Sequence, residues 1–125
     1  MKKDCLFCNI PTVRIVLENE LAYAVRDGYP VTEMHSLIIP KRHIQDYFDL
    51  TKEELIACDQ LIRSLKDEIS NSDNSVNGFN IGINSGETAG QTIFHCHIHL
   101  IPRRTGDVDN PRGGVRNIIP GMGNY

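Results

Sequence analysis

The alternation of apolar and polar residues predicts five strands in this chain. Two apolar stretches rich in β-branched residues flank the polar Glu18-Asn19-Glu20 and predict a hairpin, and a third stretch ends at Pro40. Further along, Phe79 and Ile81 alternate with polar residues, as expected for a half-buried strand. The predicted strands cover residues 13–17, 21–26, 35–39, 79–83 and 92–101.

One long amphipathic helix is predicted after residue 51. Thr51 and Glu54 have the spacing of a capping box, which marks a helix N-terminus. Apolar residues then recur at intervals of three and four, and the resulting stripe should pack on the sheet. A polar stretch over residues 71–77 ends the helical pattern. The stripe consists of Leu55, Cys58, Ile62, Leu65 and Ile69.

These elements indicate an α+β domain with a mainly antiparallel sheet, because strands joined by short connections favour antiparallel pairing. The 125 residues, 40% of them apolar and 23% charged, have the size and balance of one globular domain, so we assign residues 1–125 to a single domain. The tail from Arg103 onward is rich in Gly, Pro and Arg, and its pattern predicts no regular element.

Charge and composition exclude several classes of partner. The formal net charge of −3 offers no general attraction to nucleic acid or to an anionic membrane. No apolar run reaches the length of a membrane span, and the residues after Met1 lack the apolar stretch of a secretory signal. The cysteines form one close pair and two single positions, which favours a reducing compartment. We therefore expect a cytoplasmic protein with a small ligand, and neither nucleic acid nor membrane as partner.

Three of the five histidines occupy alternate positions of the last predicted strand, which is stopped by Pro102. Because side chains alternate across a strand, His95, His97 and His99 should share one face. The opposite face would carry Phe94, Cys96, Ile98 and Leu100. One such histidine is usually structural, and two are more often metal ligands than a nucleophile. The outer two, roughly 13 Å apart, are too distant to converge easily on one metal ion. The middle histidine is therefore expected to do other chemistry.

That middle histidine, His97, is a candidate nucleophile towards phosphorus. A neutral imidazole, with an ordinary pKa of about 6.5, is a competent nucleophile near pH 7. Attack on phosphorus also requires hydrogen-bond donors for the phosphate oxygens. Residues 82–92 offer three glycines, which permit close approach of the backbone, and several neutral donors. Taken alone, such a glycine-rich loop is also compatible with an ordinary turn. The donor side chains are Asn84, Ser85, Gln91 and Thr92.

Cys5 and Cys8 have the two-residue spacing of half a zinc site. Since the chain has no second pair with this spacing, the other ligands would be histidines, for which His43 and His95 are the candidates. A redox function is the alternative, but redox pairs usually open a helix after a strand, whereas this pair is soon followed by Pro11. We favour zinc. Four protein ligands would make it structural, because no position would stay open for a substrate.

Together these residues resemble the histidine triad (HIT) family. The family signature, His-x-His-x-His followed by apolar residues, appears here as HCHIHLI over residues 95–101. The resemblance extends to Ala89-Gly90-Gln91-Thr92 and to HSLIIPKRH over residues 35–43. It implies an α+β fold with a five-stranded antiparallel sheet, one long helix and one short helix. It also implies a homodimer in which the sheets of the two subunits join across a two-fold axis.

The resemblance also implies an activity, that of a nucleotide hydrolase. His97 would attack the α-phosphorus of a nucleotide, and water would then release a nucleoside monophosphate from the nucleotidyl-histidine. His99 would contact the phosphate or the leaving group, and Gln91 would complete the catalytic set. The resemblance assigns the phosphate region to Asn84, Gly90, Gln91 and Thr92, the ribose hydroxyls to Asp27, and the base pocket to Phe7 and Ile10.

The cysteine pair with His43 and His95 is similar to the zinc site of some bacterial family members and of the related galactose phosphate uridylyltransferases. Residues 106–116 resemble a bacterial subgroup often described as dinucleoside polyphosphate hydrolases. The favoured hypothesis is a hydrolase that cleaves a nucleotide phosphoanhydride or phosphoramidate, with dinucleoside polyphosphates among the candidate substrates. A nucleotidyltransferase with the same intermediate and a non-catalytic, zinc-stabilised nucleotide-binding module stay open as alternatives. Four arginines either neutralise further phosphates or form a solvated basic tail. They are Arg103, Arg104, Arg112 and Arg116.

Overall fold

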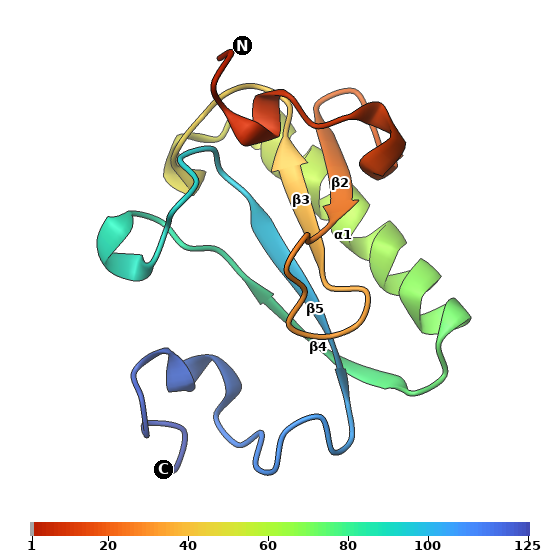
Figure 1. Ribbon diagram of the computed structural model, residues 1–125, viewed down its shortest axis with the longest axis vertical. Coiled ribbons are helices and arrows are strands. Elements are labelled where there is room, and N and C mark those ends of the chain that lie inside the picture. The colour runs from red at the N-terminus through yellow and green to blue at the C-terminus, as the bar shows by residue number, and fades with distance from the viewer. Residues whose placement is uncertain (1) are drawn as a thin grey trace.

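One antiparallel sheet, covered by a single α-helix, organises the structure, a computed structural model that describes residues 2–125 (Figure 1). Its strands pair in the order β1-β2-β3-β5-β4, and every pairing is antiparallel. The α+β class and the five-stranded sheet are therefore confirmed. The elements are β1 Ile15–Glu18, β2 Ala22–Arg26, β3 Ser36–Pro40, α1 Lys52–Ser72, β4 Val76–Gly82 and β5 Ile98–Arg104. The short 3-10 helices are η1 Leu6–Cys8, η2 Thr12–Arg14, η3 Tyr47–Asp49, η4 Glu87–Ala89 and η5 Gly114–Ile118.

The long helix α1 begins at the predicted capping box. The Thr51 hydroxyl accepts from the Glu54 N–H, and the Glu54 carboxylate accepts from the Thr51 N–H. The predicted stripe was wrong at one end, since Leu55 is 36% exposed whereas Ala57 and Leu61 are buried. Cys58, Leu65 and Ile69 are buried as predicted. In place of a second α-helix, the described residues contain only short 3-10 helices.

The central strands β2 and β3 are buried on both faces. Ala22, Ala24 and Ile38 pack against α1 in one apolar cluster. On the opposite face, the second cluster consists of Phe7, Tyr23, Val25, Leu37 and Ile39. Phe7 belongs to η1, so the N-terminal segment covers the face of the sheet that α1 does not reach. The candidate chemical groups lie on this second face.

The last strand differs from its prediction. β5 begins at Ile98, not at residue 92, and continues through Pro102 to Arg104. Pairing with β3 spans Ile98 to Leu100, and beyond that point β5 pairs with β4 alone, where a residue without an N–H is tolerated. Before Ile98 the chain leaves the sheet, and the Cys96 N–H donates to the Ile44 carbonyl instead.

Other strand boundaries shift by one to three residues. Val13 and Arg14 belong to η2 rather than to the first strand, β3 contains Pro40 but not His35, and Ile83 follows β4. Phe94 also departs from the predicted face: it is 45% exposed and lines a cavity with Cys5 and His43, whereas Cys96, Ile98 and Leu100 are buried.

The C-terminal segment extends away from α1 and ends in its own small arrangement (Figure 1). The guanidinium carbons of Arg112 and Arg116 lie 5.1 and 4.4 Å from the centre of the Tyr125 ring. Arg116 also donates to the Met122 carbonyl. Within the described part of the chain, no helix combines the length and the apolar character that a membrane crossing requires.

Candidate functional site

The N-terminal cysteines meet two histidines from distant parts of the chain. Cys5 precedes η1 and Cys8 ends it, His43 follows β3, and His95 precedes β5. The Cys5 Sγ and Cys8 Sγ atoms lie 3.4 and 3.6 Å from His95 Nδ1, and Cys8 Sγ lies 3.2 Å from His43 Nδ1. The ligand atoms of all four side chains lie within 4.8 Å of one another. The sequence therefore identified every member of this cluster.

This donor set fits zinc. Tetrahedral Zn–S and Zn–N bonds of ordinary length separate a sulfur from a nitrogen by about 3.6 Å, close to the observed separations. His95 Nε2 lies 2.7 Å from the Pro40 carbonyl, which can only accept, so the proton of this ring is on Nε2 and Nδ1 carries a lone pair. Burial also lowers the pKa of His95, which favours the neutral ring that binds a metal. Cys5, Cys8, His43 and His95 thus suit a four-coordinate, structural zinc site.

His97 is held next to this cluster with its tautomer fixed. Its Nδ1 lies 2.8 Å from the His95 carbonyl oxygen, which can only accept, so Nδ1 carries the proton. In a neutral ring the Nε2 atom then has a free lone pair. The Phe7 ring packs edge-on against His97 at a centroid distance of 5.0 Å. His97 belongs to neither cluster of potential metal ligands in residues 2–125.

His97 and His99 line a cavity of about 310 Å³ on the second face of the sheet. His97 is 9% exposed, but its ring borders this cavity and is not enclosed in the core. Most of the predicted substrate contacts reach the same cavity, and Ile10 is not among its lining residues. Ile10 instead packs against the apolar cluster around Phe7. The predicted residues that line the cavity are Phe7, Asp27, Asn84, Gly90, Thr92, His97 and His99.

A hydrogen-bonded chain from His35 fixes the tautomer of His99, and no role was predicted for His35. The Val31 N–H donates to His35 Nδ1 at 3.1 Å, so the proton of the neutral His35 ring is on Nε2. That atom lies 2.9 Å from His99 Nδ1 and 3.4 Å from the Asp27 carboxylate. His99 Nδ1 therefore accepts, and its Nε2 carries a proton. Burial lowers the pKa of His99 to about 4, which keeps this ring neutral at physiological pH.

The glycine-rich loop is shaped by Gln91, whose side chain is buried and does not line the cavity. The Gln91 carbonyl oxygen accepts from the Gly86 N–H, and its amide nitrogen donates to the Gln45 and Ile93 carbonyls. Gly86 and Gly90 have φ values of +92° and +97°, a conformation that favours glycine. The structure thus places Gln91 among backbone groups, while Gly90 and Thr92 line the cavity.

The arginines of the C-terminal region are engaged with the protein itself. Arg103 forms two hydrogen bonds to the Asp107 carboxylate, and Arg104 pairs with Asp73 at 3.0 Å. Arg112 and Arg116 stack on Tyr125. The guanidinium groups of Arg103 and Arg104 are therefore neutralised by carboxylates. Neither neutralisation of further phosphates nor a solvated basic tail describes these two residues.

The chain is similar in sequence to several known proteins. The chain is 36% identical over 110 residues to Protein hit of Bacillus subtilis, covering 81% of this chain and 72% of that protein. It is 40% identical over 99 residues to the bis(5'-adenosyl)-triphosphatase of Dictyostelium discoideum, covering 77% of this chain and 64% of that protein.

Solved structures agree with the fold. A HIT family protein from Bacillus anthracis matches with a TM-score of 0.77 and 40% identity, covering 86% of this chain and 78% of that one. A zinc-bound histidine triad protein from Mycobacterium smegmatis matches with a TM-score of 0.75 and 34% identity, covering 83% of this chain and 78% of that one. The HIT domain model itself matches residues 9–106. The chain therefore belongs to the HIT family.

Proposed function

We propose that this protein is a nucleotide hydrolase that cleaves a phosphoanhydride or a phosphoramidate at the α-phosphorus through a covalent nucleotidyl-histidine on His97. One observation carries the proposal: the proton of the His97 ring is held on Nδ1 by the His95 carbonyl, so the Nε2 lone pair of a ring that borders the cavity is free. Relatives named as a bis(5'-adenosyl)-triphosphatase and as an adenylylsulfatase support a nucleotide substrate.

The reaction would proceed in two displacements. In the first, His97 Nε2 forms a bond to the α-phosphorus, and the bond from that phosphorus to the leaving group breaks. His99 Nε2–H would donate a hydrogen bond to the departing atom, because its proton is fixed on this side of the ring. In the second, water attacks the same phosphorus, the P–N bond breaks, and a nucleoside monophosphate leaves while the proton of water passes to solvent. The His97 lone pair is then restored.

The cavity suggests how a nucleotide would lie. We propose that Phe7 packs against the base and that Asp27 accepts from the ribose hydroxyls. Phosphate contacts would come from the loop, through Asn84, Thr92 and the backbone near Gly90, all of which line the cavity with His97. Ile10 would support Phe7 from behind, since both belong to the same apolar cluster. For Gln91 we propose a positioning role, because its amide holds the loop and not the ligand.

The zinc site would support this chemistry from outside the cavity. When bound, zinc would cross-link the N-terminal segment to His95 and would supply no group that reacts. His95 in turn presents the carbonyl that fixes His97, so the residues of the zinc site would position the nucleophile through one peptide unit. A catalytic zinc ion needs an open coordination position for water or substrate, and a site with four protein ligands leaves none.

Two alternatives predict different results. A nucleotidyltransferase would share the intermediate but pass the nucleotidyl group to an acceptor, and a non-catalytic module would bind nucleotide without turnover. Neither the tautomer of His97 nor the hydrogen-bonded chain from His35 is needed for zinc stabilisation alone. This difference favours catalysis.

We also propose that two copies associate through β4, which lies at the edge of the sheet. Ile81 on this strand is 53% exposed, and a groove between β4 and α1 is lined by Ile62, Phe79 and Ile81. Pairing two such edges would continue the sheet and cover the groove. Sedimentation should then give twice the chain mass of 14.1 kDa, and a monomer mass would refute this. None of the four cysteines forms a disulfide, which supports the cytoplasm as the proposed location.

The test is direct. Incubating the protein with a dinucleoside triphosphate labelled in the nucleotide, followed by rapid denaturation and peptide mapping, should place the label on His97. His97→Ala should abolish release of the monophosphate while nucleotide affinity changes by less than about tenfold, or about 1.4 kcal/mol. Label on another residue, or turnover by His97→Ala, would refute the proposal.

A further inference from the structure

Arg14 lines the same cavity as His97, and the mechanism above gives it no role. It is an exposed residue that ends η2, immediately before β1. Gly28 lines the cavity beside it, and a Cβ atom on Gly28 would lie 3.9 Å from Nη2 of Arg14. Because Gly28 has no side chain, the guanidinium has room to lie at this edge of the cavity.

The register of the sheet places Arg14 at the end of the cavity farthest from the triad histidines. One residue from each of four strands pairs with the next, and together they form a row across the second face. Neighbouring strands lie about 4.8 Å apart, so the row spans roughly 14 Å, long enough for a nucleoside monophosphate to lie along it. Arg14 directly precedes the β1 end of the row. The row consists of Ile15, Val25, Leu37 and His99.

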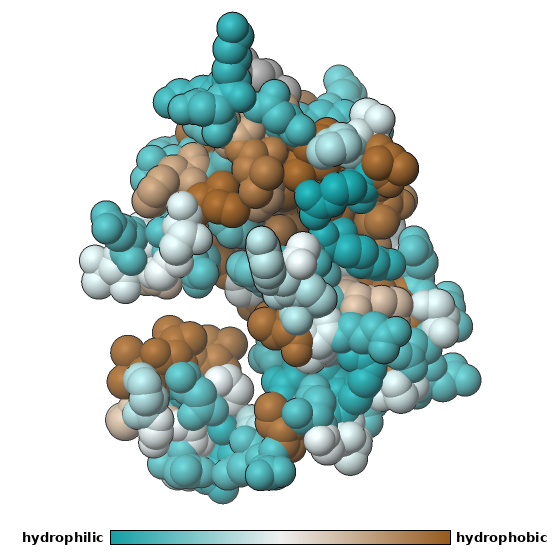
Figure 2. Space-filling model, in the orientation of Figure 1, coloured by the Kyte–Doolittle hydropathy of each residue, from teal (hydrophilic) through white to brown (hydrophobic). Residues whose placement is uncertain are grey.

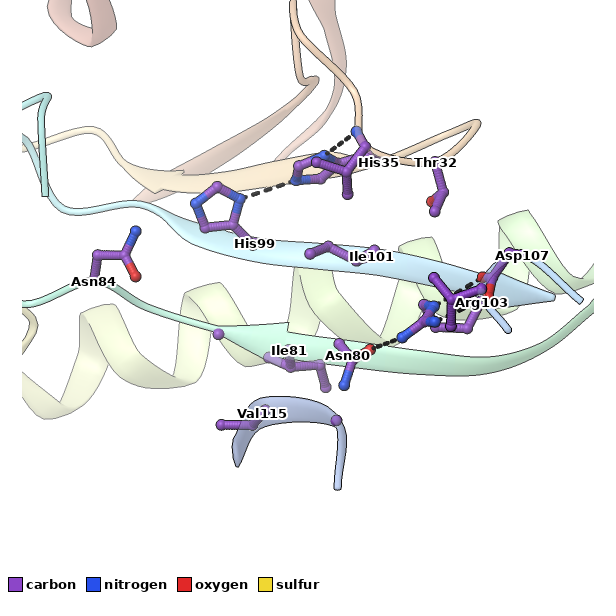
Figure 3. A pocket seen from close by; sticks show the side chains of 14 residues that line it. Thr32, His35, Asn80, Ile81, Asn84, His99, Ile101, Arg103, Asp107 and Val115 are labelled. Carbon is purple, nitrogen blue, oxygen red and sulfur yellow. Dashed lines mark hydrogen bonds and ion pairs between the residues drawn. The ribbon is translucent and has the colours of Figure 1, made fainter. Parts of the chain in front are cut away.

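This geometry decides which part of a bound nucleotide Arg14 would meet. In the proposed function the α-phosphorus lies at His97 and the phosphate oxygens near Asn84, which Figure 3 shows on one side of the His99 ring. The ribose lies at Asp27, which directly follows β2. The base continues in the same direction beyond the ribose. It would therefore lie towards β1, within reach of Arg14.

The guanidinium of Arg14 has hydrogen-bond donors to spare. Its Nη2 donates to the Arg26 carbonyl at 3.2 Å, which engages one of five N–H groups. No carboxylate of residues 2–125 forms an ion pair with it. The view in Figure 2 looks onto this face of the sheet, where apolar surface adjoins strongly hydrophilic groups. The apolar residues that line the cavity are Leu6, Phe7, Leu37 and Ile93.

From these observations we infer that Arg14 selects the base of the nucleotide, favouring a purine that carries the O6 carbonyl, such as guanine or hypoxanthine, over adenine. The inference rests on the proposed function and deepens it. A guanidinium offers donors only, and O6 and N7 of such a base are neighbouring acceptors that it can bind together. Adenine carries an amino group in place of O6, so a second donor would face the guanidinium. This preference would distinguish the chain from relatives named for adenosine-containing substrates.

Binding of nucleoside monophosphates tests the inference without turnover. Inosine and adenosine monophosphates share the sugar, the phosphate and N7, and their bases differ at C6 and N1. By calorimetry, the wild-type protein should bind inosine and guanosine monophosphates at least fivefold more tightly than adenosine monophosphate. Arg14→Met keeps much of the apolar length of the side chain and should reduce this ratio to below twofold, through weaker binding of the two oxopurine nucleotides.

Arg63→Met is the matched control. The Arg63 side chain is 78% exposed on α1, pairs with Asp59 and does not line the cavity, so this variant should change no affinity by more than twofold. Equal affinities of the wild type for inosine and adenosine monophosphates would overturn the inference. A ratio retained by Arg14→Met would also overturn it, and so would an equal loss for all three nucleotides, because a guanidinium that merely stacks on the base or attracts phosphate would affect them alike.

Turnover separates this inference from the proposed function. Guanosine and adenosine 5'-phosphoramidates have the same leaving group, so the wild type should show the same preference in kcat/KM, mainly through KM, and Arg14→Met should remove it. A preference in binding without hydrolysis of either phosphoramidate or of a dinucleoside triphosphate would refute the hydrolase and leave the role of Arg14 intact. Failure of all three monophosphates to bind would overturn both.

Discussion

The hydroxyl group of Tyr23 offers a sensitive test of how the N-terminal segment is held. Tyr23 is 6% exposed and donates a hydrogen bond to the Phe7 carbonyl, in the middle of the segment that carries Cys5 and Cys8. Burial raises the pKa of Tyr23 well above its ordinary value, so the hydroxyl remains a donor throughout the physiological range. Tyr23→Phe removes this donor with little change in shape.

The magnitude follows from the Phe7 carbonyl, which would be left buried without a donor. Such a loss costs about 1–3 kcal/mol. Because the same segment supplies two zinc ligands, we expect part of the cost to appear in zinc binding. A cost of about 1.4 kcal/mol corresponds to a tenfold higher Kd for zinc.

Competition with a chromophoric chelator measures that Kd, and urea unfolding of the zinc-loaded protein measures the free energy of unfolding. Tyr29→Phe is the matched control, since Tyr29 is 92% exposed and lies outside the cluster of zinc ligands. The reasoning is refuted if Tyr23→Phe changes the zinc Kd by less than about twofold and the free energy of unfolding by less than about 0.3 kcal/mol.

Two further predictions concern the pH dependence of stability and the metal. The Arg42 guanidinium lowers the pKa of Glu54 from 4.5 to about 2, which corresponds to about 3 kcal/mol, reduced to about 2 kcal/mol because Arg42 is half exposed. Glu54→Gln keeps the helix cap and should therefore lower the free energy of unfolding by about 2 kcal/mol at pH 7. The difference in the free energy of unfolding between the variant and wild type should shrink as the pH falls from 4.5 towards 2. Glu53→Gln is the control, and a difference in urea unfolding that does not change with pH would contradict the prediction. Cys8→Ser should reduce the zinc content from one ion per chain towards none and lower Tm by at least about 10 °C, whereas Cys58→Ala should retain one ion by elemental analysis; a zinc ion retained by Cys8→Ser would contradict the assignment.

The sequence predicted those features that depend on near neighbours. The capping box at Thr51, the strands β1 to β4 and the zinc ligands follow from local spacing or from residue type, and each was found close to its predicted position. The grouping of the three triad histidines on the face opposite α1 also follows from alternation. Even where the chain is not a strand, the rings of His95 and His97 both contact Phe7.

Features decided by distant partners could not be predicted in this way. Residues 92–97 have strong β propensity, yet the His95 ring is held by the Pro40 carbonyl and the cysteines, and Cys96 bonds to Ile44. These contacts take the chain out of the sheet, so tertiary context overrides propensity. The role of Gln91 was hidden for the same reason, because its backbone partner at Gln45 lies 46 positions away in the sequence.

The two histidine clusters show that groups outside a cluster decide its chemistry. His35, His99 and Asp27 also bring potential metal ligands within 4.8 Å of one another. Here, however, the Val31 N–H donates to His35 Nδ1, so Nε2 must keep its proton and cannot offer a lone pair to a metal. If that proton moved to Nδ1, the ring N–H would face the Val31 N–H, and neither donor would have an acceptor. At His95 the Pro40 carbonyl has the opposite effect, because it holds the proton away from the cysteines and frees Nδ1. One backbone donor and one backbone acceptor thus separate a proton-ordered histidine pair, which cannot take up a metal, from a metal site. The loss of Cys8 should therefore leave no tightly bound zinc.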